Sequence, residues 1–444
     1  MENTVHLLSN STPIALKGQN SSDNQRNNRY VILKHLFQNG ASTRNDFVTV
    51  TNLRNATITN IINEMLALGL IVQTGVTDGG RGRRVAVFSL NHDAYYAIAI
   101  RISHHYIKIG AYDTALRPVY FDKIFVDAKT NIRKVCALIV SGVSHIQQRF
   151  ARQRSMIGIA IAVNEYFYYS AGDYFFQGDP NSPPFYFGEY IWRALGTVPI
   201  VNSDQNFSTC GTYNQVRPEP GVAPVLFLYI SFKLECGIVV NGNIVDGFTG
   251  NSGKVGKIHF TTYDGRRTTF DDELSIAAIE QKAAERLPRY PGSLLQGKER
   301  ITAFDVIDGY SNQDALCTDL FDECACHLGQ LIAILMNTYD PECVYLGDAI
   351  PPSERFLNMV IFEAQKFTEI PVTLEKLHVM KKSPSDLDPI LLGAASHTTD
   401  VWLSNLFGPG EEKAQPVPKT VTAPAGSADP PAAAPPVQHG VDAG

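Results

Sequence analysis

The stretch between Thr43 and Leu90 constrains the fold of this chain more than any other part of its sequence. Residues 44–48 and 54–68 are typical of two helices, and the turn-forming Thr51-Asn52-Leu53 lies between them. Apolar residues of the second helix recur at spacings of three and four and so share one face: Ile58, Ile61, Ile62, Met65 and Leu68. Gly69 should end that helix, because glycine accepts the left-handed conformation at this position.

Two short apolar runs, residues 70–72 and 85–88, follow the second helix. Between them lies a glycine-rich loop that ends with Arg81, Arg83 and Arg84. Two strands joined by such a loop form a hairpin. A hairpin directly after two helices predicts a winged helix-turn-helix with a basic wing.

The polar face of the second helix carries groups that hydrogen-bond to bases. Arginine pairs with guanine edges and asparagine with adenine edges, in a major groove wide enough for a helix. The loop arginines suit a narrow A·T-rich minor groove, where the negative potential is strongest. The alternatives are a solvated helix face and a mobile surface loop. The candidate DNA contacts are Arg44, Arg54, Asn55, Thr57, Thr59, Asn60, Arg81, Arg83 and Arg84.

The distribution of charge agrees with DNA binding. Residues 27–90 contain seven basic and three acidic residues, a net charge of +4 in a chain of net −6. Residues 91–444 carry a net −10. A basic module on an acidic body predicts a DNA-reading domain joined to a part that does not bind DNA.

Composition limits the remaining classes of function. A hydrophobic content of 44% is ordinary, and without a run of eighteen apolar residues we expect no membrane insertion. The N-terminus lacks a signal sequence, and seven scattered cysteines suit reduced thiols, so we expect a cytoplasmic protein. Cys324-Ala325-Cys326-His327 lies in a helical stretch, where thiols two residues apart point to nearly opposite sides. We therefore expect no metal and no cofactor.

The length of 444 residues predicts two to four domains. From residue 95 onward, β-rich runs and helical segments follow one another as in an α/β layer fold, and a second set begins near residue 225. The expected organisation is a flexible arm (1–26), a winged helix-turn-helix domain (27–90), a first α/β lobe (91–203, completed by about 388–407), a second α/β lobe (204–387) and a disordered proline- and alanine-rich tail (408–444).

Several short motifs occur in a fixed order along residues 27–400. After the helix-turn-helix they include Ile157-Gly158-Ile159-Ala160, Val201-Asn202-Ser203-Asp204, Gly253-Lys254-Val255-Gly256-Lys257 and Leu392-Gly393-Ala394-Ala395. Together they resemble the ROK family of repressors, open reading frames and sugar kinases, and more narrowly its NagC/XylR-type transcriptional regulators. The resemblance implies a two-lobed body of the actin/hexokinase-like (ribonuclease H-like) α/β fold.

Kinase members of the ROK family need two glycine-rich turns that hold the phosphates of ATP. The corresponding segments here are Arg101-Ile102-Ser103-His104-His105 and Ser231-Phe232-Lys233-Leu234-Glu235-Cys236, which lack glycine. Backbone amides cannot wrap closely around a phosphate where bulky side chains hold the chain away. We therefore expect no ATP binding, no catalytic residues and no enzymatic activity.

The resemblance also implies an effector site that departs from the family pattern. Asp204 matches the family's general base, with Asn202 nearby, although Ser203 replaces the preceding asparagine. The alternative for Asp204 is a capping residue at the end of a strand. Lys254 and Lys257 stand where the family has a sugar-contacting glutamate and a zinc-binding histidine, and residues 261–269 lack the zinc cysteines, so structural zinc is not expected.

Two lysines three residues apart and facing one cleft repel each other unless an anion lies between them. Lys254 and Lys257 therefore favour an anionic effector such as a sugar phosphate or a sugar acid. In the alternative interpretation both lysines point to solvent or pair with Asp246, Asp271 or Asp272, and the pocket is defunct.

Together these features predict a cytoplasmic, sequence-specific transcriptional regulator, a repressor of carbohydrate-related genes under the control of a small molecule. Its expected partners are double-stranded DNA, an anionic sugar derivative and a second copy of itself, as a homodimer or a dimer of dimers. Two other hypotheses stay open: a body that has lost ligand binding and docks a protein, and a carbohydrate kinase.

Overall fold

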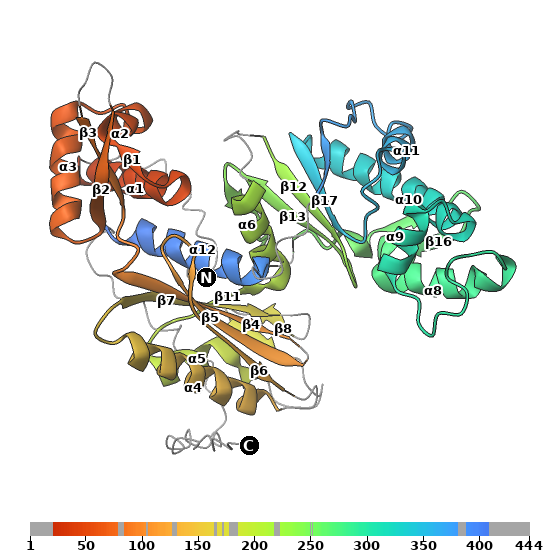
Figure 1. Cartoon of the computed structure of the whole chain (residues 1–444), viewed down its shortest axis with the longest axis horizontal. Helices are drawn as coiled ribbons and strands as arrows, with labels where there is room; N and C mark the ends of the chain where they lie inside the picture. The colour runs from red at the N-terminus through yellow and green to blue at the C-terminus, as the bar shows by residue number, and fades with distance from the viewer. Residues whose placement is uncertain are drawn as a thin grey trace, which may run out of the picture. The chain divides into compact units, whose positions relative to one another are not determined.

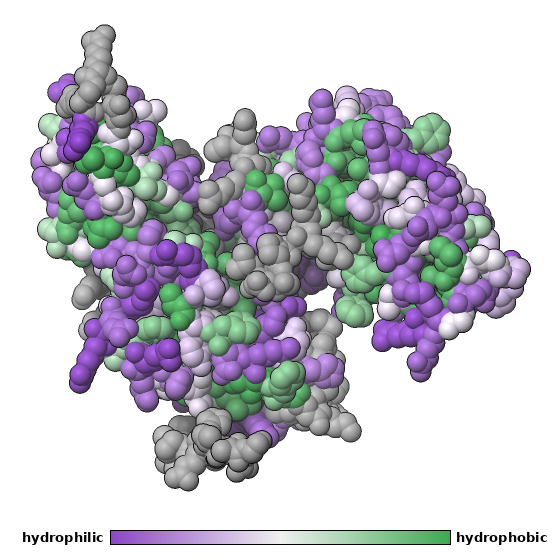
Figure 2. Space-filling view, viewed as in Figure 1, coloured by the Kyte–Doolittle hydropathy of each residue, from purple (hydrophilic) through white to green (hydrophobic). Residues whose placement is uncertain are grey.

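The computed structural model describes residues 21–78, 84–103, 105–126, 131–163, 167–170, 173–176, 185–216, 223–248, 250, 252–380 and 388–407. The expected tail, 408–444, lies outside these ranges, as does most of the expected arm, 1–26. None of the described helices is both long and apolar enough to cross a membrane. Hydrophilic and hydrophobic residues are interspersed over the face of the molecule shown in Figure 2.

The N-terminal module, here called the reader, consists of three helices and a three-stranded sheet of order β1-β3-β2 (Figure 1). Thr43 and Asp46 form a capping box at the start of α2, and Asn52, with φ 55°, ends this helix. Gly69, with φ 69°, follows α3 as predicted. The elements are α1 Ser21–Asn39, β1 Ser42–Thr43, α2 Arg44–Thr51, α3 Asn55–Ala67, β2 Ile71–Asp78 and β3 Arg84–Leu90.

The apolar face of α3 forms the centre of the reader core, as its spacing predicts. Four of its residues are at most 6% exposed: Ile58, Ile61, Ile62 and Met65. Leu68 is 54% exposed, contrary to expectation, because it lies at the C-cap, beyond the last buried turn. Helix α1 begins at Ser21, so part of the expected arm is helical. Its first turns are polar and show no apolar periodicity, so the pattern does not reveal them.

The first lobe contains a five-stranded sheet of order β11-β7-β4-β5-β6, in which β4 pairs antiparallel with β5 and parallel with β7. Alternate residues of β4 face opposite layers, because side chains alternate along a strand. Ile98 and Ile100 pack in one core with α4 and α5, and Ala97 and Ala99 pack in another with α12. The elements are β4 Tyr95–Ile102, β5 Tyr106–Asp113, β6 Pro118–Phe125, α4 Ile132–Phe150, β7 Ser155–Val163, β8 Phe167–Ser170, β9 Asp173–Phe176, β10 Phe185–Tyr186, α5 Phe187–Leu195 and β11 Ile200–Ser203.

The second lobe repeats this strand order as β14-β13-β12-β17-β18, again with one antiparallel and one parallel neighbour of the central strand β12. The same order in both lobes confirms the predicted two-lobed fold. The elements are β12 Val225–Ile230, β13 Leu234–Val240, β14 Asn243–Ile244, η1 Val255–Lys257, β15 His259–Thr261, β16 Arg267–Thr269, α7 Phe270–Leu274, α8 Ile276–Arg286, η2 Leu287–Arg289, α9 Ala303–Ser311, α10 Ala315–Tyr339, β17 Cys343–Asp348, α11 Glu354–Ala364 and β18 Leu377–Val379.

Two further helices, α6 (Asp204–Val216) and α12 (Pro389–Asn405), pack closely against each other. Helix α6 contacts β7 and β11 of the first lobe and β13 and β14 of the second. A Cβ atom on Gly211 would lie 2.0 Å from the carbonyl oxygen of Pro389, and one on Gly393 would lie 1.7 Å from that of Phe207. The two backbones therefore touch without side chains between them at these positions.

Candidate DNA interface and lobe-junction site

The polar face of α3 is available to a ligand. Arg54, Asn55, Thr57 and Asn60 are exposed, on the side of the helix away from the reader core. Thr59 is less exposed than these residues, and its hydroxyl donates a hydrogen bond of 2.8 Å to the carbonyl oxygen of Asn55. Arg54, Asn55 and Asn60 carry the groups that bidentate base recognition uses, whereas Thr59 is partly engaged within its own helix.

Two of the remaining predicted DNA contacts, Arg44 and Arg84, lie in the described part of the reader. Arg44 is half-buried in the first turn of α2, and its Nε has no hydrogen-bond partner within the described part of the chain. Arg84 is exposed. In the antiparallel register of β2 and β3 its backbone lies opposite that of Asp78, at the end of the described part of the hairpin. Arg81 and Arg83 lie outside the described residues.

Two cations of the basic module do not contribute to a DNA surface. Arg29 forms a bidentate ion pair with Glu64, with Nη2 and Oε2 2.8 Å apart, which fastens α1 to α3. The Nζ atom of Lys34 lies 3.4 Å from Asp400 of α12. Glu64 is already counted in the net charge of +4, whereas Asp400 lies outside residues 27–90, so including Asp400 lowers the net charge of the reader from +4 to +3.

The first predicted effector residue, Asn202, is buried in a network that joins the lobes. It is the penultimate residue of β11, is 7% exposed, and donates a hydrogen bond of 3.1 Å to Asp246, which follows β14. Its side-chain oxygen accepts hydrogen bonds from the Ser203 backbone and from Asn206, both 2.8 Å long. Since every polar group of this amide is engaged, Asn202 links the two sheets and is not free to bind a ligand.

Asp204, the first residue of α6, keeps an unused hydrogen-bonding atom. Its Oδ2 accepts a hydrogen bond of 3.1 Å from Nε of Arg101. Its Oδ1, like Nε2 of the buried Gln205, has no hydrogen-bond partner among the described residues. Burial raises the pKa of the Asp204 carboxyl to about 6, although Arg101 opposes this effect. Two neighbouring residues at the start of α6 therefore each carry a buried polar atom without a hydrogen-bond partner among the described residues: the acceptor Oδ1 of Asp204 and the donor Nε2 of Gln205.

Arg101 also bonds to the capping residue of α12. Its Nη1 lies 3.3 Å from Oδ2 of Asp388, and that oxygen accepts a second hydrogen bond of 2.7 Å from Lys108. Arg101 is the first residue of the segment that corresponds to the first phosphate turn of the kinases, and the second such segment, 231–236, comprises the turn between β12 and β13 and the start of β13. Both segments are therefore engaged in the fold, and the guanidinium is committed to two carboxylates.

The structure contradicts the reason for predicting an anionic effector. Lys254 forms an ion pair with Glu235, and Nζ of Lys257 lies 3.2 Å from Oδ2 of Asp271. Asp204 neutralises neither lysine, because its partner is Arg101. Each ammonium group already has its own carboxylate, so the two lysines do not require an anion between them. The alternative interpretation foresaw the pair with Asp271.

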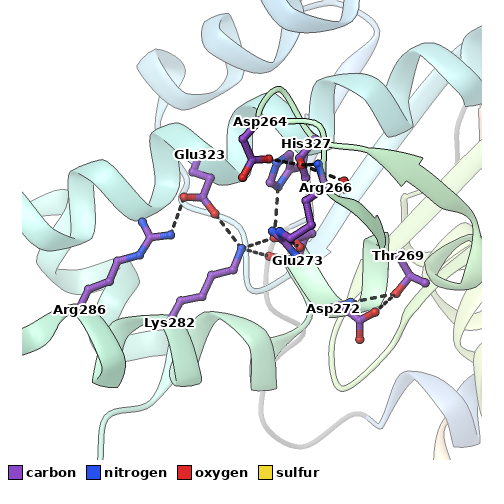
Figure 3. Close-up of polar contacts among 10 residues, drawn as sticks. Asp264, Arg266, Thr269, Asp272, Glu273, Lys282, Arg286, Glu323 and His327 are labelled. Atoms are coloured by element: carbon purple, nitrogen blue, oxygen red, sulfur yellow. Dashed lines mark hydrogen bonds and ion pairs between the residues drawn. The ribbon is translucent and has the colours of Figure 1, made fainter.

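A cluster of charged side chains in the second lobe includes His327, the last residue of the Cys324-Ala325-Cys326-His327 segment. Glu273, Glu323 and His327 present ligand atoms within 4.8 Å of one another. The ammonium group of Lys282 lies between the carboxylates, 2.6 Å from Glu273 and 2.8 Å from Glu323 (Figure 3).

Arginines complete this cluster. Arg266 lies 2.8 Å from Glu273, and Arg286 lies 2.6 Å from Glu323. Three cations thus surround two carboxylates, and a divalent ion would have to displace Lys282 against this excess positive charge. Burial lowers the pKa of His327. Since Arg266 precedes β16, its ion pair with Glu273 fastens the β15–β16 hairpin, the segment in which the family resemblance places zinc cysteines that this chain lacks.

Sequence reasoning missed Gln205, Arg101 and Asp388 as members of this site. Arg101 appears in the sequence only as a bulky residue in a phosphate turn, and Asp388 has no motif around it. Arg101 lies in β4, Gln205 lies just after β11, and Asp388 is the N-cap of α12. A predicted order of the parallel strands could have suggested that these three residues lie close together. The pattern alone does not show which charges pair across such distances.

The fold and the exposed polar helix define a winged helix-turn-helix protein with a two-lobed, sugar-kinase-like body. A model of the ROK family matches residues 97–400. The chain belongs to the ROK family.

Proteins similar in sequence to this chain include two that are named as repressors. The DNA-binding transcriptional repressor Mlc of Escherichia coli is 21% identical over 374 residues, covering 80% of this chain and 89% of Mlc. The xylose repressor of Caldicellulosiruptor bescii is also 21% identical, over 72% of this chain and 82% of its own.

Solved structures show the same fold. The crystal structure of a ROK family transcriptional regulator, a homologue of E. coli Mlc, superposes with a TM-score of 0.68 at 21% identity, covering 87% of this chain and 98% of that one. A ROK hexokinase from Thermus thermophilus has a TM-score of 0.50 at 16% identity, over 68% of this chain and 97% of its own.

Proposed function

We propose that this protein is a sequence-specific, DNA-binding transcriptional repressor of carbohydrate-related genes that acts in the cytoplasm as a homodimer or a dimer of dimers. The observation that carries the proposal is the exposed polar face of α3. Its opposite face is anchored in the reader core by four buried apolar residues, so the helix is presented rigidly. The relatives named as repressors support the same role.

The reader binds DNA through two kinds of contact. Arg54, Asn55 and Asn60 reach base edges in the major groove and set the sequence preference. Arg44 and the wing arginine Arg84 contact phosphate or the minor groove and contribute affinity that depends on salt.

The effector is a small carbohydrate that binds at the start of α6. A sugar hydroxyl both donates and accepts a hydrogen bond. It therefore complements the vacant acceptor Oδ1 of Asp204 and the vacant donor Nε2 of Gln205. An unpaired buried polar atom costs about 1–3 kcal/mol, so a ligand that satisfies both atoms removes that penalty.

The body is a sensor and not an enzyme. Asp204, which matches the general base of the kinases, shares its charge with Arg101 in an ion pair. The phosphate-turn segments are built of bulky residues, and Phe232 at one of them is 78% exposed. These features support the loss of ATP binding.

The decisive experiment is to select duplexes from a random DNA pool with the purified full-length protein, and to sequence the bound fraction. A single enriched motif supports the proposal, and enrichment no better than that of the Arg54→Ala variant contradicts it. The selected duplex then serves in binding titrations with D-glucose, D-xylose, glucose 6-phosphate and gluconate. Release by a neutral sugar fits the site at Asp204, release by the phosphate or acid alone restores the anion hypothesis, and no response favours a protein ligand.

A further inference from the structure

Helix α12 connects the two sites described above. Its N-cap, Asp388, shares the guanidinium of Arg101 with Asp204, the proposed effector residue. Its Oδ1 also accepts the backbone N–H of Ile390 at 3.1 Å, so this carboxylate fixes the first turn of the helix. Any ligand that draws Asp204 or Arg101 into new hydrogen bonds changes the contacts of this cap.

The middle of α12 borders the network that joins the lobes. His397 lies on the side of α12 that faces α6, with its ring centroid 6.0 Å from that of Phe207. It interacts electrostatically with Asp246, the acceptor of Asn202 and Asn206, and also with Asp400 and Lys34. The pKa of this one histidine is therefore affected by charged groups from the lobe junction, from α12 itself and from α1.

The C-terminal end of α12 belongs to the reader. Leu403 is fully buried in the reader core together with Ile32, Leu33 and Ile58. Asp400 accepts hydrogen bonds from the Tyr30 hydroxyl at 3.1 Å and from Lys34 at 3.4 Å.

The seventeen residues of α12 span about 25 Å at 1.5 Å per residue. A continuous helix of this length, without proline after its first turn, is stiff enough to carry a displacement from one end to the other. We propose that α12 couples effector binding at Asp204 to operator affinity, with Arg101 and Asp388 as the receiving end and Asp400 as the transmitting end.

This inference rests on the proposed function. A double-mutant cycle on the full-length protein tests the coupling role of α12 separately from DNA recognition, and it needs no known effector because only the affinity for DNA is measured. Arg101→Gln alters the receiving end, and Asp400→Asn removes the charge from the transmitting end. The affinity for the DNA duplex obtained by selection is measured by fluorescence anisotropy for the wild type, both single variants and the double variant. Circular dichroism and thermal unfolding check that each variant is folded.

Arg101→Gln is expected to weaken operator binding by about fivefold or more, the lower range of allosteric coupling, and this effect should largely disappear in the Asp400→Asn background. Independent sites would instead give effects that multiply to within about twofold. The matched control is Asp322→Asn, which also removes one carboxylate from a surface ion pair of similar exposure (34% against 32%) on a helix outside this path. In its background the effect of Arg101→Gln should be unchanged.

Asp204→Asn provides a second, isosteric change at the receiving end if Arg101→Gln does not fold. Multiplicative effects for both pairs, or receiving-end variants that leave operator affinity unchanged, would overturn the coupling role of α12 while leaving DNA recognition intact. Failure of the wild type to bind any selected duplex would instead remove the proposed function itself.

Discussion

The hydroxyl of Tyr30 in the first helix donates a hydrogen bond of 3.1 Å to Asp400 in the last helix, 370 residues later in the chain. Together with the buried Leu403, this contact shows that residues 27–90 alone do not close the core of the DNA-reading module. The segment 388–407 contributes both to the first lobe and to the reader. The reader and the body are therefore not joined only by the chain between β3 and β4.

The first prediction separates base recognition from phosphate attraction. Arg54→Ala should reduce discrimination between the selected duplex and a mismatched one by ~1–3 kcal/mol, because it removes a base contact. Replacing Arg81, Arg83 and Arg84 together by alanine should weaken binding to all duplexes and flatten its dependence on salt. Arg355→Ala, an exposed arginine of the second lobe, is the control. Equal salt slopes for the wild type and the wing variant would contradict the proposed role of the wing.

The second prediction concerns assembly. A single reader offers a small DNA surface, so we expect a two-fold dimer that reads half-sites one or two helical turns apart, at about 34 Å per turn. The subunit contact should lie in the body, because the reader is too small to supply both surfaces. Light scattering at micromolar concentration tests this, and a monomeric mass together with a selected motif lacking two-fold symmetry would argue against it.

These two predictions depend on features that the sequence does reveal. The spacing of Ile58, Ile61, Ile62 and Met65 locates α3 and its buried face, since a helix packed on one side keeps a regular apolar period. The apolar runs that begin at residue 95 and near residue 225 likewise mark the first strands of the two sheets, β4 and β12, because buried strands are continuous apolar runs. Local patterns of this kind are read directly from neighbouring residues.

Other features depend on contacts that no local pattern carries. Helix α6 is packed between α12 and β13 and contains small and polar buried residues such as Asn206 and Thr209, so it lacks an amphipathic period. Lys254 and Lys257 find carboxylates from separate segments, Glu235 and Asp271. The sequence shows the charges, but the pairing follows from the tertiary fold.

The third prediction uses the titration of Asp204, whose pKa burial raises from 3.8 to about 6. Between about pH 4 and pH 6 the folded state therefore holds a proton that the unfolded state has released, and the contribution of this group to stability falls as the pH rises through that window. Asp204→Asn cannot titrate and should lack this slope. The free energy of unfolding of both proteins, measured in urea across this range, should differ by an amount that depends on pH; parallel curves would contradict the shift.

The fourth prediction concerns the ion-pair cluster of the second lobe. Lys282→Met should destabilise the protein by ~1–3 kcal/mol, because it removes the hydrogen bonds that the buried ammonium group donates to Glu273 and Glu323 and leaves each carboxylate with one arginine. Lys298→Met breaks a more exposed pair with Asp305 and should cost only about 0–1 kcal/mol. Chemical denaturation measures both, and similar costs for the two variants would show that the cluster is not a buried network in solution.

The contact between Gly211 and Gly393 has a mechanical consequence. Where two helices meet through side chains, rotamer changes can absorb a relative displacement of a few tenths of an ångström. At these glycines the carbonyl oxygens of Pro389 and Phe207 would lie only 2.0 and 1.7 Å from an added Cβ atom, so no layer of side chains separates the backbones. No side chains can therefore absorb a displacement between α6 and α12 at this crossing. If one helix shifts, the backbone of the other must shift with it.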